Sequence, residues 1–531
     1  MSDTPLVEWS ACPPERDPGV YKAGMRYLVD GKVLEWRGSS FKVLSPVYEA
    51  GQRRFLGECA LVDADAARAA VAAAAKAFGR GRGAWPTASV PERLACFEDF
   101  LKRMEAKRLE IAKLICWEIA KPWADALAEV DRTVAYGRDT AAALKQLDRD
   151  SSRFVLDGGF AAQVRRSPYG VALCMGPYNY PLNETFATLL PALVMGNTVV
   201  VKLPRLGMLC SMPLLDAFGA AFPPGVVNII PGEGSVVVNP VIESGEMDLL
   251  AFIGSAKVAN GIKKLHPRPN RLRCVLGLGS KNPAIILKDA DPVETAKECL
   301  SGALTFNGQR CTALKMLFVH RSIADTFVAE LSAGAGKLKM GMPFIDGVSI
   351  TPLPEGGVEK MTGLLEDAKA KGAAVVNPRG GQTDKSFFTP AVVYPVKPGM
   401  RLWSEEQFGP IVVVAPFDDA HEVLDWLADS SFGQQASLFT RDAAAAGPLV
   451  DALANLVCRV NLNTQCRRGP DTFPFGGRRD SAEGTLSVTD ALRVFSIRTV
   501  VAAKQGGKDA ELVQAILRER RSRFLTTDFL F

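Results

Sequence analysis

The stretch GVALCMGPYNYP (170–181) decides the fold, because it is a short apolar run that ends in glycine, proline and polar residues. Three similar runs follow it, separated by helical-looking stretches: GNTVVVKLP (196–204), GVVNIIPG (225–232) and DLLAFIGS (248–255). Short Val- and Ile-rich runs that alternate with helices are typical of a parallel sheet buried on both faces. The pattern therefore predicts an α/β fold with a doubly wound sheet. Ligands of such sheets bind beyond the carboxyl ends of the strands, where the polar residues of these runs fall.

The segment before this sheet reads as helical. Residues 63–79 are Ala-rich and begin with aspartate, which favours a helix. Residues 89–122 open with Ser89 and Glu92 at capping-box spacing and close at a proline, which predicts one long helix. A further helix is expected from about 123 to 147. Residues 1–24 are rich in proline, glycine and charge, and we expect a loosely ordered arm there.

A second α/β block is expected to begin near NPAIILKDAD (282–291) and to continue through WSEEQFGPIVVVAPF (403–417). RRGPDTFPFGG (467–477) has the composition of a loop. ALRVFSIRTVVAAK (491–504) is apolar and β-branched enough to predict a late strand. The charged residues after it predict a helical tail.

Composition excludes several classes of protein. The chain has 531 residues, and its 63 Lys and Arg nearly balance 58 Asp and Glu, which argues against a nucleic-acid or membrane-surface partner. No run approaches the roughly 18 apolar residues of a membrane span. Only three histidines and no CxxC pair occur, so no metal site is expected. Eleven cysteines in a chain without a signal peptide indicate reduced thiols and a cytoplasmic protein.

Two residues could carry acyl chemistry. Cys311, in TFNGQRCTALK (305–315), would be a nucleophile if its environment favoured the thiolate, but taken alone such a cysteine is more often structural. Asn179 follows the first apolar run, and its amide could stabilise an oxyanion. Taken alone, a turn asparagine is the commoner interpretation.

Cofactor contacts are suggested at the ends of two other runs. Lys202 and Arg205 could meet a ribose or a phosphate, although each alone is more often a solvated charge. Gly254 and Ser255 could lie at a helix N-terminus that faces a pyrophosphate. The sequence has no GxGxxG motif.

The order of the motifs is more specific than any one of them. The chain carries, in sequence order, PYNYP, VVVKLPR, FIGS, LGLGSK, FNGQRCT, EEQFGP and FPFGG. This order resembles the aldehyde dehydrogenase superfamily from about residue 26 to 503. The resemblance implies two doubly wound parallel-sheet domains plus a β-flap for oligomerisation. The implied division is an arm (1–24), a dinucleotide-binding domain (25–150 and 171–281), a catalytic domain (282–487), the flap (151–170 and 488–503) and a tail (504–531).

Within the superfamily, the chain is most similar to the non-phosphorylating NADP-dependent glyceraldehyde-3-phosphate dehydrogenases. The segments that carry this similarity are EIAKPWADALAEVDR (118–132), GQRCTALK (308–315), SITPLPE (349–355) and CRRGPDTFPF (466–475). The resemblance implies a substrate-phosphate site made of Arg132, Tyr180, Arg310 and Arg468. Arginine forks suit a phosphate dianion. Arg467 is a rival for the place of Arg468.

The resemblance also implies roles for the remaining residues. Cys311 would attack the aldehyde, while the Asn179 amide and the Cys311 N–H stabilise the oxyanion. Lys202 and Glu406 would hold the cofactor riboses, and Phe408 would pack near the nicotinamide. Arg205 stands where relatives that prefer NAD often have a glutamate, so NADP is expected, with NAD possible.

One departure from the family pattern affects the last chemical step. The family keeps a glutamate base in an ELGGK segment, but this chain reads GLGSK (277–281) and has Gly277 at that position, 34 residues before Cys311 (311 − 277). Ser280 and Ala259 also replace family glycines. General-base help is worth about 10²–10⁴-fold, so slow thioester hydrolysis is expected.

Three alternatives follow from the lost glutamate. Another carboxylate, Glu406 first, could activate water. Coenzyme A could take the acyl group, as in an acylating semialdehyde dehydrogenase. Turnover could also be lost, leaving a dinucleotide- or sugar-phosphate-binding protein. We expect an NADP-dependent enzyme of a small phosphorylated aldehyde that forms a homotetramer or homodimer.

Overall fold

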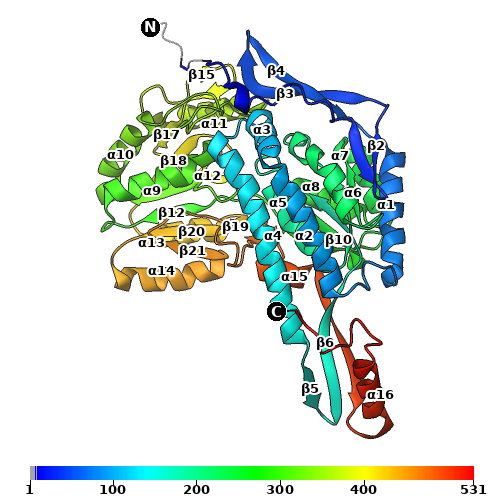
Figure 1. Cartoon of the computed structure of the whole chain (residues 1–531). Coiled ribbons are helices and arrows are strands. Elements are labelled where there is room, and N and C mark those ends of the chain that lie inside the picture. Colours follow the sequence, from blue (N-terminus) through cyan, green and yellow to red (C-terminus); the bar gives the residue numbers. More distant parts are fainter. Residues whose placement is uncertain (1–5, 8, 531) are drawn as a thin grey trace.

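The structure is a computed structural model that describes residues 6, 7 and 9–530. Two open sheets with helices packed over them form the body, and a narrow arm of strands projects from it (Figure 1). The expected α/β architecture with two parallel-containing sheets is confirmed. None of the helices among the described residues is long and apolar enough to cross a membrane.

The first sheet has eight strands in the order β2-β1-β9-β8-β7-β10-β11-β23. The strands from β9 to β11 in this order are parallel, and β1 and β23 pair antiparallel with them. The edge strand β2 pairs antiparallel with β1. Their bounds are β1 (Arg26–Val29), β2 (Lys32–Glu35), β7 (Val171–Met175), β8 (Thr198–Lys202), β9 (Val227–Ile230), β10 (Leu249–Ile253), β11 (Arg273–Gly277) and β23 (Ala482–Glu483). Strand order reverses between β7 and β10, and such a switch point opens a crevice for ligands. The four quoted runs thus form neighbouring buried strands, as predicted.

The second sheet has seven strands in the order β14-β17-β18-β13-β12-β20-β21, all parallel except β14. Their bounds are β12 (Pro283–Ile286), β13 (Met316–His320), β14 (Ala374–Val375), β17 (Ala391–Tyr394), β18 (Ile411–Phe417), β20 (Gln435–Phe439) and β21 (Arg459–Leu462). Three two-stranded sheets lie outside these two. They pair β3 (Ser40–Glu49) with β4 (Gln52–Ala60), β15 (Thr383–Asp384) with β16 (Phe387–Phe388), and β19 (Phe432–Gly433) with β22 (Arg478–Arg479). The remaining strands, β5, β6 and β24, form the arm described below.

Sixteen α-helices occur within the described residues, and their caps follow the sequence. Asp63 accepts the Ala66 N–H at 2.9 Å, and Ser89 and Glu92 form the expected capping box. The bounds are α1 (Ala64–Phe78), α2 (Val90–Ala106), α3 (Arg108–Glu118), α4 (Trp123–Ser151), α5 (Asn183–Val194), α6 (Leu215–Ala221), α7 (Gly234–Glu243), α8 (Ala256–Leu265), α9 (Pro292–Leu304), α10 (Ala324–Gly336), α11 (Gly357–Ala370), α12 (Arg401–Ser404), α13 (Ala420–Asp429), α14 (Ala443–Leu456), α15 (Val488–Val494) and α16 (Gly507–Arg518).

The projecting arm is a three-stranded antiparallel sheet in the order β24-β6-β5. It consists of β5 (Phe154–Asp157), β6 (Phe160–Pro168) and β24 (Ser496–Lys504), and α16 lies beside it (Figure 1). The last described residues return to this arm, because the Thr526 carbonyl accepts from the side chains of Gln163 and Arg165. The helical tail is therefore formed over Gly507–Arg518, and the irregular chain after it packs back onto the arm.

Three details of the predicted elements are wrong. Residues 89–122 form two helices, because the chain turns at Lys107 so that α3 can bury Ile111–Glu118. Residues 491–494, expected to begin a strand, belong to helix α15. Ser487 caps this helix, which buries Val488, Ala491 and Leu492 at helical spacing. Residues 482–483, expected in the second block, form an edge strand of the first sheet.

The N-terminal segment is more firmly attached than its composition suggested. Residues 1–5 and 8 lie outside the described residues. Trp9 packs edge-on against Tyr48 and Phe387, and the Arg16 guanidinium donates to the Phe344 carbonyl at 2.6 Å. Aromatic and arginine side chains therefore anchor the segment, although it holds little regular secondary structure.

Candidate functional site

A pocket of about 750 Å³ lies between the two sheets, at the carboxyl ends of β7, β10 and β11. It brings together most of the residues that the sequence singled out: Arg132, Asn179, Tyr180, Gly254, Ser255, Gly277, Arg310, Cys311, Glu406, Phe408 and Arg468. Lys202 and Arg205 do not line this pocket. The motifs that are far apart in the sequence therefore share one cavity.

A strained turn delivers Cys311 to the pocket. Phe306 and Asn307 have left-handed backbone angles, with φ of 50° and 55°, and Phe is a residue that rarely adopts them. The Asn307 side chain holds the turn through two 3.0 Å hydrogen bonds with the Thr351 backbone. A Cβ on Gly308 would lie 2.6 Å from the Ala303 carbonyl oxygen, so only glycine fits there. Strain of this kind persists where the surrounding structure enforces it.

The Cys311 backbone is fixed by the segment that follows β11. Its carbonyl accepts hydrogen bonds from the Ser280 hydroxyl and, at 2.8 Å, from the Asn282 amide. Burial raises the pKa of the Cys311 thiol to about 11, with the carboxylates of Glu184 and Glu406 adding to the rise. The Arg468 guanidinium opposes this shift. The thiol is therefore protonated at neutral pH before any ligand binds.

Asn179 lies in the loop between β7 and α5, next to the cysteine turn. Its amide nitrogen donates to the Gln309 carbonyl at 2.7 Å, two residues before Cys311. An amide NH₂ carries two donors, so one remains for a group in the pocket. Asn179 is buried, which makes such a donor effective toward a developing negative charge.

A buried ion pair between Lys121 and Glu129 stabilises the loop that carries Asn179. The Lys121 ammonium bonds the Glu129 carboxylate and donates to the Asn179 carbonyl at 2.7 Å. Glu129 in turn accepts the backbone N–H groups of Leu182 and Asn183, which open α5. Both side chains of the pair are fully buried. The pair thus fixes the position of Asn179 relative to the cysteine turn.

Two arginines of the pocket, Arg132 and Arg468, have close carboxylate partners. Arg468 forms a buried ion pair with Glu184 and lies 3.5 Å from Asp471. Arg132 binds the same Asp471 through two hydrogen bonds of 2.7 and 2.9 Å. Within the described part of the chain, the Nη2 atom of Arg468 has no hydrogen-bond partner. Arg468 thus keeps one donor for another group.

Arg310 and Tyr180 face the same region of the pocket. The Arg310 guanidinium donates to the Gly302 carbonyl at 2.8 Å, and its Nε atom has no partner among the described residues. Burial raises the pKa of the Tyr180 phenol, while the nearby charges of Arg310 and Arg132 lower it. Because the phenol stays neutral, its O–H remains a donor. Arg467, the rival of Arg468, is half-exposed and donates to the Thr464 hydroxyl at 2.7 Å.

Gly277 ends β11 and leaves a gap where a side chain would fit. A Cβ there would meet Ile253 Cγ1 at 3.3 Å, a contact that a small shift of the isoleucine side chain relieves. Glu406 lies nearby, because its carboxylate accepts the Ser280 N–H at 3.2 Å. The Lys315 ammonium lies 3.6 Å from the same carboxylate oxygen. A carboxylate is thus present in the pocket despite the glycine.

The remaining cofactor candidates lie in two places. Lys202, at the end of β8, is buried, and its pKa falls to about 8 because of burial, with Glu233 opposing and Arg205 adding to the shift. Arg205 is exposed. Ser255 caps α8 by accepting the Val258 N–H at 3.4 Å, so the helix N-terminus faces the pocket beside Gly254.

Sequence reasoning missed Glu184, the buried partner of Arg468. A signal was present, since every residue of α5 is buried and a carboxylate in such a helix requires a partner. It also missed the Lys121–Glu129 pair. No group of three or more metal-ligating side chains occurs among the described residues.

The chain is similar to known proteins of one family over most of its length. The family model described as "Aldehyde dehydrogenase family" matches residues 36–501. A NADP-dependent glyceraldehyde-3-phosphate dehydrogenase of Streptococcus equinus is 34% identical over 78% of this chain and 86% of its own length. The enzyme of that name from Zea mays is 30% identical over 89% of this chain and 93% of its own. A crystal structure of the Bacillus halodurans C-125 NADP-dependent glyceraldehyde-3-phosphate dehydrogenase complexed with NADP superimposes with a TM-score of 0.83, at 31% identity, over 91% of this chain and 100% of that one.

Proposed function

The chain belongs to the aldehyde dehydrogenase family, and on that premise we propose that it oxidises glyceraldehyde 3-phosphate, or a similarly small phosphorylated aldehyde, to the acid with NADP as oxidant. The observation that carries this proposal is the shared pocket of Cys311, Asn179 and the arginines. The relatives that bear this name span most of the chain and of their own lengths.

The phosphate would bind on the arginine wall of the pocket. Arg468 Nη2 and Arg310 Nε are buried donors without partners among the described residues. Arg132 and the neutral Tyr180 hydroxyl lie at the same wall. Charge-assisted hydrogen bonds to a phosphate are roughly twice as strong as neutral ones. Glu184 and Asp471 already balance part of this charge, so the site favours one compact dianion over a more highly charged ligand.

The residues present also fit a dinucleotide with a 2′-phosphate. Arg205 is exposed and has no carboxylate partner among the described residues, so its charge is available beside Lys202. Only glycine fits at position 254, before the N-terminus of α8, since a Cβ there would lie 2.4 Å from the Phe252 ring. Lys202, Arg205, Gly254, Ser255, Glu406 and Phe408 would hold NADP, with NAD as a weaker alternative. When bound, NADP accepts the hydride from the substrate carbon.

The chemistry of the chain's own groups then follows. Cys311 Sγ loses its proton to water and forms a bond to the aldehyde carbon, and the electron pair of the C=O bond moves to the oxygen. The Asn179 amide and the Cys311 N–H stabilise the resulting oxyanion. Loss of the hydride leaves a thioester on Cys311. Water attacks the thioester carbon, its proton passes to a base, and the C–S bond breaks to release the acid.

The base is the unusual part of this site. Gly277 supplies none, and Glu406 is the carboxylate we assign to water activation. One oxygen of Glu406 accepts the Ser280 N–H. Glu184 is another carboxylate that lines the pocket, but it is already paired with Arg468. If neither carboxylate acts, coenzyme A would be the acyl acceptor. This second candidate function is favoured by one observation, the absence of a side chain at Gly277.

The projecting arm is the proposed oligomerisation element. Its strands expose large apolar side chains, among them Leu156 at 67% and Val500 at 57% exposure. An exposed apolar strand edge is a ready site for pairing. We assign it to a homodimer or homotetramer contact. All eleven cysteines are free, and this supports the cytoplasm as the compartment.

The substrate proposal is tested by comparing kcat/KM for glyceraldehyde 3-phosphate and glyceraldehyde. The phosphorylated substrate is expected to be preferred, and Arg310→Gln should reduce that preference about tenfold or more. Equal kcat/KM values for the two aldehydes would overturn it. For the cofactor, Arg205→Glu should shift the NADP-to-NAD ratio of kcat/KM toward NAD by at least about tenfold.

A further inference from the structure

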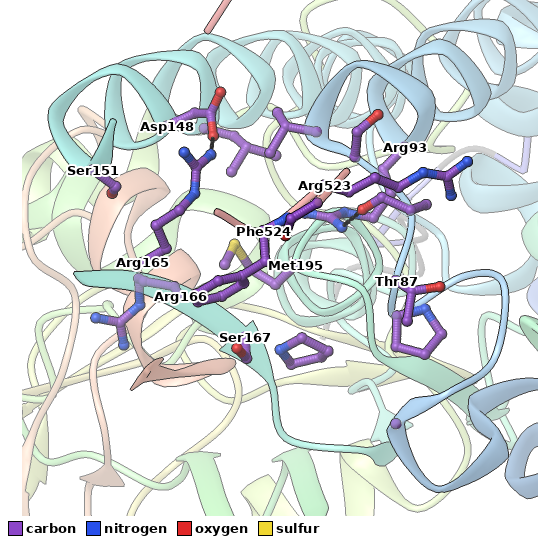
Figure 2. A pocket seen from close by; sticks show the side chains of 18 of the residues that line it. Thr87, Arg93, Asp148, Ser151, Arg165, Arg166, Ser167, Met195, Arg523 and Phe524 are labelled. Atoms are coloured by element: carbon purple, nitrogen blue, oxygen red, sulfur yellow. Dashed lines mark hydrogen bonds and ion pairs between the residues drawn. The ribbon is translucent and has the colours of Figure 1, made fainter. Parts of the chain in front are cut away.

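A second pocket, of about 660 Å³, lies at the base of the arm and shares no lining residue with the Cys311 pocket. The ends of α2 and α4, strand β6 and the returning chain at residues 521–524 enclose it (Figure 2). Its volume falls within the range of small-molecule sites. The reaction proposed above does not use this pocket.

Arginine dominates its lining. Five arginines line the pocket, against one carboxylate, that of Asp148: Arg93, Arg165, Arg166, Arg521 and Arg523. Five hydroxyl side chains lie among them: Thr87, Ser89, Ser151, Ser167 and Ser522. Figure 2 shows several of these side chains around the cavity, with Arg165 joined to Asp148. The one lining carboxylate is therefore already paired. Two carboxylates outside the lining also contact these arginines, because Glu92 lies 3.1 Å from Arg523 and Glu519 lies 3.0 Å from Arg521.

Arg93 is the least compensated of these charges. It is only 6% exposed, and its guanidinium donates to the carbonyls of Val194, at 2.7 Å, and of Ala88. No carboxylate within the described residues forms an ion pair with it, and burial lowers its pKa to about 10. Asp148 and Glu92 oppose this shift, but their ion-pair partners are Arg165 and Arg523. A buried guanidinium without its own counter-charge is costly, and an anion in the pocket would offset that cost.

We propose that this pocket binds a small phosphate-bearing metabolite. The guanidinium groups supply the charge-assisted donors that a phosphate monoester needs. Leu144, Met195 and Phe524 supply an apolar surface for a short carbon skeleton. The ligand would join Arg523 of the returning chain to Arg93 of the body.

Two helices connect this pocket to the Cys311 pocket. Helix α5 ends at Val194, whose carbonyl binds Arg93, and begins with Asn183 and Glu184 at the other site. Helix α4 carries Asp148 at this pocket and Arg132 at the other, about 24 Å apart along its axis. Occupancy is therefore expected to change the KM for the aldehyde as well as to order the returning chain.

Hydrogen–deuterium exchange of the full chain, with and without inorganic phosphate at low ionic strength, tests the proposal. Phosphate is expected to slow exchange in peptides that cover residues 86–93 and 519–527. The variant Arg521→Gln/Arg523→Gln should weaken this protection at least about tenfold in phosphate concentration. Its matched control is Arg520→Gln, an exposed arginine of the same segment that pairs with Asp528 and does not line the pocket.

The outcomes separate clearly. Protection that the double variant loses and the control keeps supports the site. Equal protection in both variants, or no protection of residues 86–93 in the wild type, would overturn it. Protection confined to the Cys311 pocket would also overturn it, while leaving the proposed reaction intact.

Discussion

Glu184 and Arg468 form a buried ion pair inside the pocket that holds Cys311. Glu184 comes from the second position of α5, and Arg468 comes from a loop 284 residues further along the chain. The pair sets two properties of the site at once. It balances the arginine that a substrate phosphate would use, and it brings a negative charge near the Cys311 sulfur.

The first prediction concerns the pH dependence of the free thiol. The pKa of Cys311 is raised to about 11, and only the thiolate reacts with iodoacetamide. Below the pKa, the thiolate fraction rises tenfold for each pH unit, so alkylation should accelerate about tenfold per unit between pH 7 and 10. Mass spectrometry of the Cys311 peptide measures this rate. A rate that levels off near pH 8 would contradict the raised pKa.

The second prediction tests the charge of Glu184. Glu184→Gln removes an anion that raises the thiol pKa and frees Arg468, which lowers it, so both effects favour the thiolate. A fall of one pKa unit raises the thiolate fraction about tenfold, and alkylation at pH 8 should quicken severalfold. Glu355→Gln is the control, since Glu355 lines the same pocket but is exposed. Identical rates in the two variants would show that the ion pair does not act on Cys311.

Much of the fold could be predicted from the sequence because its signals are local. The runs at 170–177 and 196–204 have apolar centres, Val171–Met175 and Val199–Val201, and buried parallel strands have that composition. The capping box likewise depends on two residues, Ser89 and Glu92, that lie three positions apart in the sequence. By contrast, β23 has only two residues and forms because the chain passes the edge of β11. The local sequence carries no signal for a strand that forms through such a long-range contact.

The site was predictable only in part, for a similar reason. Motif order was enough to single out Cys311, Asn179 and the arginines. It could not reveal that Arg468 is paired with Glu184, because the two are joined only by the tertiary fold. Motif order also could not show that Lys202 and Arg205 lie outside the lining of the Cys311 pocket. A position at the end of a strand does not fix the distance of a side chain from the sulfur.

The third prediction restores the missing carboxylate. Gly277→Glu should speed steady-state turnover by about 10²–10⁴-fold if thioester hydrolysis limits the rate. The three atoms nearest to such a Cβ all belong to the Ile253 side chain, which has to shift by only a few tenths of an ångström to admit it. Gly277→Ala is the matched control, because it adds the same Cβ without a base. If both variants turn over at the same rate, hydrolysis is not the slow step.

The fourth prediction concerns the buried Lys121–Glu129 ion pair that holds the Asn179 backbone. Lys121→Met leaves the Glu129 carboxylate buried without its counter-charge, and breaking such a pair costs about 3–5 kcal/mol in free energy of unfolding. Urea denaturation measures the loss. Lys371→Met removes the exposed pair with Asp367 and should cost far less. Equal losses in the two variants would contradict a structural role for the buried pair.

The most direct test of the central claim is rapid-mixing measurement of NADPH formation from glyceraldehyde 3-phosphate. Acylation of Cys311 followed by slow hydrolysis predicts a burst of about one NADPH per chain and then slow turnover, with no burst in Cys311→Ser. A burst that turns over only when coenzyme A is added would assign the acyl group to that acceptor. The absence of any burst, while NADP still binds, would contradict the proposed reaction.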